Sequence, residues 1–450
     1  MQIRFGTDGL RGKANTELTP ELALALGSAS AMVLGQPDWF VGWDTRISST
    51  MLASAFAAGV ASTGRGITQL GEMPSAGVAY VCRGRSLPGA MVTASHNPYH
   101  DNGIKIFGAD GRKISDDLEH GIEDVLARLL AGSSAAPRPP VTGRLTYPEP
   151  EIQGTYEGWL RRNAEAVDAS RLRIGVDCAN GAAYRVAPIV LAATGATVAV
   201  MGDHPDGTNI NRGCGSTHLD PLAQLVMDQG LDLGLAFDGD ADRVLAIAGD
   251  GQIVDGDEII AILARHRAAT GALPGNGVVV TEWSNLGLLQ SLRGDGFQVE
   301  VCAVGDKAVA ETIKRTGYVL GGEQSGHIIM DDLFPIGDGL LTAIELLGAV
   351  AAAALPLGQL AAGAMRKLPQ GMRNVAVAVP PARVVSALED EKRAINDELG
   401  DRGRLVLRAS GTEPVVRVMV EADDEALVSD IVTRVADMVA KHGGTTPDPL

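Results

Sequence analysis

The sequence predicts an α/β protein of about three or four domains, the last of which is of the α+β type. Three observations predict this fold class. The chain has 450 residues, and a single hydrophobic core rarely serves more than about 250–300 residues. Apolar runs alternate with amphipathic segments as far as Leu368, a pattern typical of α/β units. The remaining residues follow a different pattern, in which alternating strands surround two helices.

Composition and charge narrow the class of partner. Hydrophobic residues make up 45% of the chain and charged residues 21%, as in an ordinary globular protein. The net charge is −17, from 55 acidic and 38 basic residues, and this excess disfavours nucleic acids and anionic membrane surfaces as partners. If the substrate is an anion, its site must be locally basic. Arginine and lysine in loops rich in glycine or serine are therefore the residues of interest.

Cysteine spacing and apolar segments indicate the cellular compartment. The four cysteines (Cys82, Cys178, Cys214 and Cys302) are far apart and form no CxxC pair, so reduced thiols and a cytoplasmic location are expected. The first residues lack the apolar core of a signal peptide. The most apolar stretch, Leu346–Leu355, is too short for a membrane span of about 20 residues, so it predicts an alanine-rich buried helix.

The individual elements follow from the alternation of apolar runs and amphipathic segments. The runs predicted as strands are Trp39–Trp43, Gly89–Thr93, Arg173–Asp177, Thr197–Met201, Leu231–Phe237, Gly277–Thr281 and Val299–Val304. The segments predicted as helices include Glu21–Leu34, Ser49–Thr63, Ala187–Thr194, Leu219–Gln229 and Gly256–Ala269. Strands and helices therefore take turns along the chain, as α/β units require.

Three segments mark the expected domain boundaries. Gly132–Pro150 is rich in serine, proline and glycine, which suits a linker, and the others lie near Asp250–Asp257 and Leu368–Arg373. The predicted domains are residues 1–150, 151–252, 253–368 and 369–450. In the last domain, the expected strands are Val375–Val379, Leu405–Arg408 and Val415–Glu421, and the expected helices are Pro381–Leu399 and Asp424–His442.

The most informative loop is Thr93-Ala94-Ser95-His96-Asn97-Pro98, which follows the apolar run Pro88–Thr93. A serine at the exit of a buried strand, braced by a turn that ends in proline, is well placed to act as a nucleophile or phosphoryl carrier. Taken alone, such a segment is more often an ordinary polar turn. Three polar loops downstream, each suited to a different part of a phosphosugar, favour the functional interpretation.

A second loop, Asp238-Gly239-Asp240-Ala241-Asp242-Arg243, follows the apolar run Leu231–Phe237. In an extended chain the three aspartates share one face, where their carboxylates would repel one another unless a cation lay among them. Oxygen ligands favour Mg²⁺ over zinc, and Arg243 beside the metal suits a phosphate oxygen. A solvated acidic turn is the alternative. An EF-hand is excluded because Arg243 and Gly249 stand where that motif requires glycine and glutamate.

The third loop is Gly321-Gly322-Glu323-Gln324-Ser325-Gly326-His327. Carboxylate, amide, hydroxyl and imidazole groups this close together suit hydrogen bonding to several sugar hydroxyl groups. Taken alone, the segment is more often a polar turn, and His327 is equally compatible with a satisfied surface histidine.

The fourth loop is Arg408-Ala409-Ser410-Gly411-Thr412-Glu413-Pro414, with Arg417 on the strand that follows. Successive backbone N–H groups in a Ser-Gly-Thr turn form an anion-binding nest, and flanking arginines add charge and bidentate geometry. This loop meets the demand for local positive charge in an acidic chain. The alternative is a hairpin turn with exposed arginines.

Together the four loops resemble those of the α-D-phosphohexomutase superfamily, in the family's order and over essentially the whole chain. Within it, the sequence is most similar to the phosphoglucosamine mutases. The supporting segments are Phe5–Gly12, Val176–Ala182, Cys214–His218, Ser284–Gly287 and the Gln324 form of the third loop. The sequence departs from the family's pattern in three places, namely Glu282-Trp283, Phe334-Pro335-Ile336 and Lys307, where arginine is common.

The resemblance implies four domains around a central cleft: a phosphoserine domain, a metal-binding domain, a sugar-binding domain and a phosphate-binding C-terminal domain. It implies that Ser95 carries a phosphoryl group and that Lys105 is a general acid or base. It further implies that Mg²⁺ is bound by Asp238, Asp240, Asp242 and phosphorylated Ser95, that Arg243 contacts a phosphate oxygen beside the metal, and that Arg11 and His96 support the phosphoserine. The sugar would be bound by Glu323 and Ser325, with proton transfer or phosphate contact by His327. The residues implied to bind the phosphate that does not react are Arg408, Ser410, Gly411, Thr412 and Arg417.

The resemblance also implies a reaction and its participants. The expected activity is that of an isomerase that interconverts glucosamine 6-phosphate and glucosamine 1-phosphate through a 1,6-bisphosphate. One Mg²⁺ per active site, phosphorylated Ser95 and a hexose 1,6-bisphosphate primer are the expected cofactors, and a hexosamine phosphate is the expected small-molecule partner. A homodimer is compatible with the resemblance.

Other activities are distinguishable by sequence features. A phosphomannomutase or phosphoglucomutase would use the same mechanism on a different sugar, and the resemblance of the opening motif Phe5–Gly12 and of the Gln324 form argues against it. A phosphatase that hydrolyses its phosphoserine would have little use for the second phosphate loop around Arg408. A non-catalytic sugar-phosphate sensor would be expected to lack Ser95 or one of the aspartates.

Overall fold

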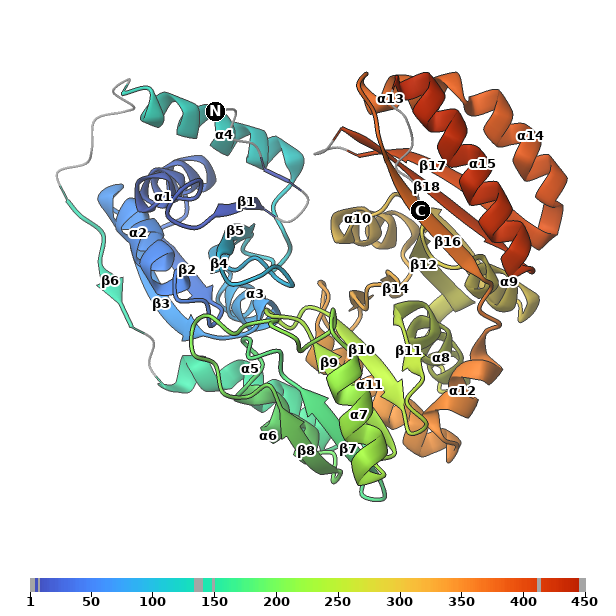
Figure 1. Ribbon diagram of the computed structural model, residues 1–450. Coiled ribbons are helices and arrows are strands. Elements are labelled where there is room, and N and C mark those ends of the chain that lie inside the picture. Colours follow the sequence, from blue (N-terminus) through green and yellow to red (C-terminus); the bar gives the residue numbers. More distant parts are fainter. Residues whose placement is uncertain (1–4, 7–8, 133–140, 148–149, 411–413, 445–450) are drawn as a thin grey trace. The chain divides into compact units, whose positions relative to one another are not determined.

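The computed structural model describes residues 5–6, 9–132, 141–147, 150–410 and 414–444 (Figure 1). The chain divides into two compact units. The first comprises residues 1–283 and 297–364, and the second comprises residues 284–296 and 365–450. Three sheets lie in the first unit and one in the second, which confirms the predicted fold class. The predicted domain boundaries stay predictions.

The first sheet has the strand order β1-β5-β4-β2-β3-β6. Its strands are β1 (Leu10–Lys13), β2 (Asp38–Trp43), β3 (Gly66–Glu72), β4 (Gly89–Val92), β5 (Asp101–Phe107) and β6 (Leu145–Thr146). Its helices are α1 (Pro20–Leu34), α2 (Ser49–Ser62), α3 (Ser75–Arg85) and α4 (Asp116–Leu130). Strand β2 runs parallel to β3 and β4, whereas β5 is antiparallel to β4. The fully buried rings of Trp39 and Phe56, 6.2 Å apart, lie in the core between the sheet and α2.

The second and third sheets repeat this arrangement, with orders β11-β10-β9-β7-β8 and β13-β12-β14-β15. The second consists of β7 (Arg173–Asp177), β8 (Thr197–Met201), β9 (Leu233–Phe237), β10 (Val244–Ala248) and β11 (Ile253–Val254), with helices α5 (Pro150–Ala164), α6 (Val186–Ala192) and α7 (Asp220–Gln229). The third consists of β12 (Gly277–Thr281), β13 (Gln298–Cys302), β14 (Leu320–Gly322) and β15 (Ile328–Met330), with helices α8 (Gly256–Ala269), α10 (Asp306–Thr316), α11 (Gly339–Ala353) and α12 (Leu357–Ala364).

Each of these sheets contains an equivalent hairpin. Its first strand pairs in parallel with a neighbouring strand of the sheet, and its second strand pairs antiparallel with the first. The hairpins are β4–β5, β9–β10 and β14–β15. Their connections are residues 93–100, 238–243 and 323–327, which carry the first three sequence loops. The three similar domains therefore present the same structural position three times, each time with different chemistry.

The second unit is an antiparallel sheet with strand order β16-β18-β17. It contains β16 (Gln370–Ala376), β17 (Gly403–Ala409) and β18 (Val415–Ala422), together with α9 (Leu286–Gly294), α13 (Pro381–Ala387), α14 (Glu389–Leu399) and α15 (Glu425–Gly443). This α+β arrangement was predicted, with two differences. The first strand begins at Gln370 rather than Val375, because its pairing with β18 extends back to that residue. The single helix predicted over residues 381–399 breaks at Leu388. The dihedral angles of this residue (φ −106°, ψ 12°) are not helical, and its side chain is buried in the core.

An aromatic cluster joins the three domains of the first unit. Tyr80 from α3 stacks on Trp159 from α5 with ring centroids 5.0 Å apart, and Phe334 lies 5.5 Å from Trp159. Tyr156 completes the cluster, 5.9 Å from Tyr80. Phe334 is buried, so this departure from the family's pattern has a packing role: aromatic contacts of this kind add to the free energy of burial.

Asp338 connects this cluster to α11. One carboxylate oxygen accepts hydrogen bonds from the backbone N–H groups of Leu340 and Leu341, and the other accepts from Tyr156 Oη at 2.9 Å. Burial raises the pKa of Asp338 to about 6. Because the folded state holds this proton more tightly than the unfolded state, the stability that Asp338 contributes is present below its ordinary pKa and is lost as pH rises toward 6.

Replacement of Asp338 by asparagine is therefore expected to stabilise the protein at pH 7 but not at pH 4. Asparagine keeps an oxygen for the helix cap and an amide for Tyr156, and it removes a charge whose cost at pH 7 is roughly 3 kcal/mol. Thermal unfolding of both proteins at the two pH values, with a chelator present, measures this difference. An equal gain in Tm at both pH values would show that charge is not the cause.

Two other predictions concern the cysteine thiols and helices that could span a membrane. The four cysteines are free thiols. In the described part of the chain, no single helix is long and apolar enough to cross a membrane, and α11 with α12 meets that test only as a pair bent by 93°. The helix predicted at Leu346–Leu355 forms the second half of α11 and is buried as far as Val350, but residues 352–355 are exposed because the helix ends there at the surface.

Candidate active site

Ser95 lies just beyond the end of β4, in a strained backbone conformation. Its φ angle is +50°, in the left-handed region that residues other than glycine rarely adopt. Its backbone N–H donates to Thr93 Oγ1 at 2.9 Å. Its side chain is buried, and Oγ donates to Asp238 Oδ2 at 2.5 Å. The serine loop of the first domain is therefore in direct contact with the aspartate loop of the second.

The three aspartates do converge, but not for the reason that the sequence pattern offered. Residues 238–243 form a turn rather than an extended strand, and Ala241 has a φ of +56°. One ligand atom from each of Asp238, Asp240 and Asp242 lies within 4.8 Å of the others, and all three residues are buried. At Gly239 a Cβ atom would come within 2.5 Å of the Ser95 carbonyl oxygen, so glycine is needed for the close approach of the two loops.

Two residues of the first domain, Lys105 and Ser75, contact two of the aspartates. Lys105, on β5, is buried and places Nζ 2.7 Å from Asp240 Oδ2 and 3.0 Å from Asp242 Oδ2. Ser75, the first residue of α3, donates from Oγ to Asp240 Oδ2 at 2.5 Å. The same Ser75 donates its backbone N–H to the Asp240 carbonyl oxygen at 3.0 Å. The side-chain contacts of Lys105 and Ser75 are therefore to the Oδ2 atoms of the two aspartates and not to their Oδ1 atoms.

The donor set fits a hard divalent cation. Asp240 Oδ1 and Asp242 Oδ1 are buried and have no hydrogen-bond partner, which is costly for a carboxylate unless an ion supplies the missing charge. Burial, together with Asp242 and Asp240, raises the pKa of Asp238 well above its ordinary value. Burial also favours the neutral form of Asp242, but Lys105, His327 and Arg243 outweigh it and lower the pKa of that carboxyl.

His327 is buried, so the alternative of a surface histidine is wrong. Its Nδ1 lies 3.7 Å from Asp242 Oδ1 and its Nε2 lies 3.8 Å from Asp306 Oδ2. Burial lowers the pKa of His327, but Asp242, Asp306 and Glu323 together outweigh burial and raise it above the ordinary value. Asp306 in turn pairs with Lys113 of the first domain. A chain of charged groups thus crosses all three domains of the first unit.

His96, Arg11 and Arg243 lie around Ser95 and the aspartates. His96 Nδ1 is 3.4 Å from Ser95 Oγ. Burial, with the positive charges of Arg243 and Arg11, lowers the pKa of His96 to about 4, so its imidazole is neutral at physiological pH. Arg243 Nε lies 3.7 Å from Asp242 Oδ1. The structure therefore brings the predicted residues of the phosphoserine site together.

The third loop is fixed in place by its neighbours. The Glu323 backbone N–H donates to the His327 carbonyl oxygen at 3.0 Å, and Glu323 Oε1 accepts from the Gly305 N–H at 3.0 Å. Gln324 Nε2 donates to Asp255 Oδ2 at 3.2 Å. Ser325 Oγ is buried and has no hydrogen-bond partner, so it retains capacity to bind a sugar hydroxyl group.

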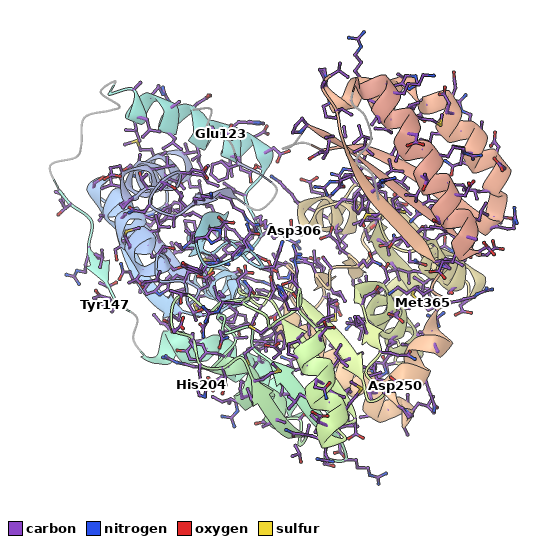
Figure 2. All side chains as sticks on the ribbon, in the orientation of Figure 1. Glu123, Tyr147, His204, Asp250, Asp306 and Met365 are labelled. Atoms are coloured by element: carbon purple, nitrogen blue, oxygen red, sulfur yellow. The ribbon has the colours of Figure 1, made fainter. Side chains whose placement is uncertain are left out.

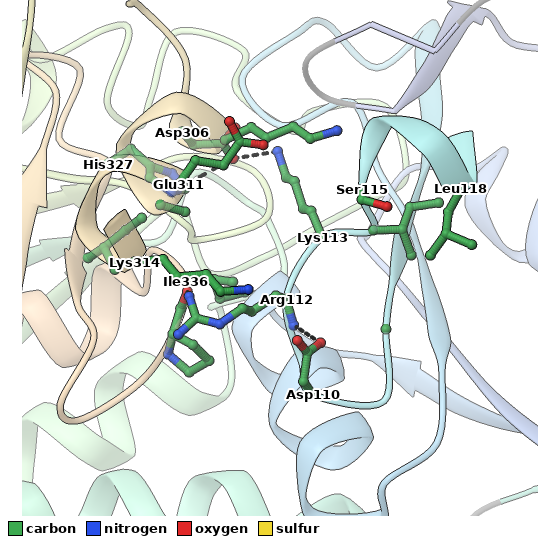
Figure 3. Close-up of a pocket in the computed structure, with 16 residues that line it drawn as sticks. Asp110, Arg112, Lys113, Ser115, Leu118, Asp306, Glu311, Lys314, His327 and Ile336 are labelled. Atoms are coloured by element: carbon green, nitrogen blue, oxygen red, sulfur yellow. Dashed lines mark hydrogen bonds and ion pairs between the residues drawn. The ribbon is translucent and has the colours of Figure 1, made fainter. Parts of the chain in front are cut away.

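A cavity of about 320 Å³ adjoins His327. Its walls come from residues 108–118 of the first domain and 306–336 of the third. Figure 3 shows Lys113 reaching from one wall to Asp306 on the other, and Asp306 begins α10 where Figure 2 labels it. Lys307, a departure from the family's pattern, pairs with Asp116 and, at 3.1 Å, with Glu119 of α4. Neither Ser95 nor the three converging aspartates of the second loop line this cavity.

The fourth loop belongs to the second unit. Arg408 on β17 stands directly opposite Arg417 on β18, and the Ser410 N–H donates to the Val415 carbonyl oxygen at 3.0 Å. Like charges on directly opposed residues destabilise a sheet unless an anion compensates them, which suits a phosphate site. Gly411 and Thr412 lie outside the described residues, so the nest itself stays a prediction.

The polar side chains that sequence reasoning missed include three that contact the first two loops. Ser75 holds Asp240, while Arg46 and Asn211 both donate to the Ser95 carbonyl oxygen. Arg46 offered one usable signal. It follows β2, whose carboxyl end lies beside that of the parallel strand β4, and polar residues at such an edge commonly share a site. Ser75 and Asn211 gave no comparable signal.

Relatives in sequence cover nearly the whole chain. A protein of Desulforudis audaxviator described as "Phosphoglucosamine mutase" is 46% identical over 448 residues, covering 98% of each chain. One of Bacillus cytotoxicus with the same description is 44% identical over 452 residues, covering 98% of this chain and 99% of its own.

Solved structures share the fold. A phosphoglucomutase/phosphomannomutase family protein of Burkholderia thailandensis matches with a TM-score of 0.84 at 23% identity, covering 98% of each chain. N-acetylphosphoglucosamine mutase of Aspergillus fumigatus, solved with GlcNAc-6P and magnesium, matches with a TM-score of 0.69 at 17% identity, covering 98% of this chain and 96% of its own.

Family models match all four parts of the chain. The α/β/α domains I, II and III of phosphoglucomutase/phosphomannomutase match residues 2–131, 156–251 and 255–368, and the C-terminal domain matches residues 372–438. With relatives of this identity over the full length, the chain belongs to the phosphoglucomutase/phosphomannomutase family, within the α-D-phosphohexomutase superfamily.

Proposed function

We propose that this chain interconverts glucosamine 6-phosphate and glucosamine 1-phosphate, with Ser95 as the phosphoryl carrier. The observation that carries the proposal is the 2.5 Å contact of Ser95 Oγ with Asp238 in a cluster of three buried carboxylates. A nucleophilic hydroxyl beside a cation site is the arrangement that phosphoryl transfer requires. The relatives described as phosphoglucosamine mutases support the choice of sugar.

Asp238, Asp240 and Asp242 would hold one Mg²⁺, with a phosphoserine oxygen as a further ligand. The fit rests on the two carboxylate oxygens that have no hydrogen-bond partner. When bound, the cation offsets negative charge on the phosphoryl group. Arg243 and Arg11 would bind its other oxygens, and neutral His96 would support the serine.

In the forward direction the bond between phosphorus and Ser95 Oγ breaks, and a bond from phosphorus to O1 of glucosamine 6-phosphate forms. The proton of the sugar hydroxyl passes to a general base, and Ser95 Oγ regains a proton when the serine is released. Lys105 is our candidate for this acid–base role, and His327 assists it, because both lie against Asp242. The product of this half-reaction is glucosamine 1,6-bisphosphate.

The bisphosphate would then reorient and return its 6-phosphoryl group to Ser95. Glu323 and Ser325 would bind sugar hydroxyl groups, while Arg408, Ser410, Gly411, Thr412 and Arg417 would bind the phosphate that does not react. A hexose 1,6-bisphosphate would phosphorylate Ser95 at the start. The product, glucosamine 1-phosphate, would serve amino-sugar metabolism.

The test of the substrate compares initial rates on glucosamine 6-phosphate, glucose 6-phosphate and mannose 6-phosphate with Mg²⁺ and a hexose 1,6-bisphosphate primer. We expect kcat/KM for the amino sugar to be roughly 10- to 100-fold higher, because one polar group distinguishes the sugars. A preference for glucose or mannose would favour a phosphoglucomutase or phosphomannomutase. Release of inorganic phosphate that matches loss of substrate would indicate a phosphatase instead.

A further inference from the structure

A buried arginine lies directly beneath the serine loop. Arg46, in the connection between β2 and α2, is 1% exposed. Its Nε donates to Asp44 Oδ2 at 2.9 Å, and its backbone N–H donates to Asp44 Oδ1 at 3.1 Å. Ser49 Oγ donates to the same Oδ1 at 2.6 Å. The counterion of the guanidinium is therefore itself fixed, so the orientation of Arg46 is determined by the first domain.

The two terminal nitrogens of Arg46 donate to four backbone carbonyl oxygens between Ser95 and Asp101. Nη2 donates to the carbonyl oxygens of Ser95 and Asn97, each at 2.8 Å. Nη1 donates to the carbonyl oxygens of Pro98 and, at 3.1 Å, Asp101. One planar group thus binds the loop from Ser95 to the first residue of β5. A lysine ammonium could not reproduce this forked geometry.

The second domain adds a donor at the same place. Asn211 Nδ2 donates to the Ser95 carbonyl oxygen at 2.8 Å and to the Asn97 carbonyl oxygen at 3.0 Å. The Ser95 carbonyl therefore accepts from two side chains that come from different domains, while Gly239 packs against it. This is where the serine loop meets the domain that carries the aspartates.

These contacts account for the strained conformation of Ser95. A non-glycine residue in the left-handed region costs about 1–2 kcal/mol, and it persists only where the surroundings determine it. Thr93 fixes the Ser95 N–H, and Arg46 and Asn211 fix its carbonyl group. With both peptide groups held, the side chain can reach Asp238 Oδ2. A relaxed Ser95 would turn its Oγ away from the aspartates.

We propose that Arg46 is a positioning residue, which holds Ser95 so that its phosphoryl group lies in line for transfer and among the aspartates. This inference rests on the proposed phosphoserine mechanism. Arg46 acts through the loop backbone and not on the sugar, because its side-chain hydrogen bonds to the described residues go to backbone carbonyl oxygens between Ser95 and Asp101 and to Asp44. Its loss should therefore reduce the rate of transfer and leave sugar binding intact.

The test uses Arg46→Lys in the full-length protein, with Arg267→Lys as the matched control. Arg267 is a similarly buried arginine of the third domain. It forms ion pairs with Asp332 and Glu345 and donates a hydrogen bond to the Ala272 carbonyl oxygen. The readouts are the rate at which a hexose 1,6-bisphosphate phosphorylates Ser95, followed by intact mass, and kcat, KM and Tm. Asn211→Gly is a milder companion, because glycine tolerates the φ of +57° at that position.

For Arg46→Lys we expect serine phosphorylation and kcat to fall about 30- to 100-fold, since a shift of about 1 Å in a reacting group can cost that much. KM should change less than about twofold, and Asn211→Gly should lose about 3- to 10-fold in kcat by removing only part of the support. Arg267→Lys should lower Tm by a similar amount to Arg46→Lys while keeping wild-type rates.

Three results would overturn the inference: wild-type phosphorylation in Arg46→Lys, a loss of activity in Arg267→Lys equal to that in Arg46→Lys, or a change in KM as large as the change in kcat. If both Arg46→Lys and Asn211→Gly keep wild-type rates, the loop needs no support from the side chain of Arg46 or of Asn211. Failure of the proposed phosphoserine mechanism looks different, because the wild-type protein itself would then acquire no phosphoserine.

Discussion

Replacement of Ser95 by alanine is expected to lower the mutase rate by a factor of about 10⁴ or more, because the hydroxyl oxygen that accepts and returns the phosphoryl group is lost. Among the described residues, Ser95 supplies the hydroxyl group that donates to Asp238. Steady-state rates with a primer present, together with intact mass after exposure to a hexose 1,6-bisphosphate, measure the loss of both activity and phosphorylation.

The effect on stability should be small by comparison. Ser95→Ala removes one side-chain hydrogen bond to Asp238, for which a loss of about 1–2 kcal/mol is typical. Ser28→Ala is the matched control, because Ser28 is also buried and also hydrogen bonded, to the Gly59 carbonyl oxygen at 3.0 Å, but lies in the core of the first domain. That variant should keep its phosphoserine. Full activity in Ser95→Ala would refute the phosphoserine mechanism.

The fold was predictable where its strands are short runs dominated by apolar residues between polar turns. β7, β8 and β12 have the predicted bounds, since runs such as Gly277–Thr281 are buried on both faces of a sheet. The strand β5 was not predicted. It carries polar residues, among them the buried Asn102 and Lys105, whose partners come from distant parts of the chain. Such tertiary pairing overrides local pattern.

The candidate site was predictable for the opposite reason: its polar residues cluster in short loops that interrupt apolar sequence. The sequence did not reveal that three of the loops connect equivalent hairpins in three similar sheets, because the loops share no repeated sequence. Ser75 and Asn211 were missed because neither stands in such a loop, and their roles follow only from contacts between domains. The turn at Asp238 was also invisible, because Ala241 is an unusual residue for the left-handed region.

The second large effect is expected at Asp238, where stability and activity should change in opposite directions. Without a cation, burial and the neighbouring Asp242 and Asp240 raise the pKa of Asp238. The folded state is therefore most stable when this carboxyl is protonated, and it loses stability as pH rises from the ordinary value through the raised one. At pH 7 the metal-free protein carries this cost, and asparagine, of nearly the same size, removes it.

Asp238→Asn should thus raise the Tm of the metal-free protein at pH 7 by the equivalent of about 1–3 kcal/mol. It should also abolish the further rise in Tm that Mg²⁺ gives the wild type, which is about 2.7 kcal/mol at a hundred times the dissociation constant. Mutase activity should fall by a factor of about 10³, because a cation ligand and the partner of Ser95 are both altered. Thermal unfolding with a chelator and with Mg²⁺, beside activity, measures all three changes.

Asp177→Asn is the control for the loss of a buried carboxylate as such. Asp177 ends β7 in the same sheet, burial raises its pKa, and its oxygens accept from the N–H groups of Ala179 and Gly215. This variant should respond to Mg²⁺ as the wild type does, because Asp177 is not one of the three converging aspartates. If Asp238→Asn still gained stability from Mg²⁺, or if it were less stable than the wild type in the chelator, the carboxylate at position 238 would be a structural hydrogen-bond acceptor and not a cation ligand.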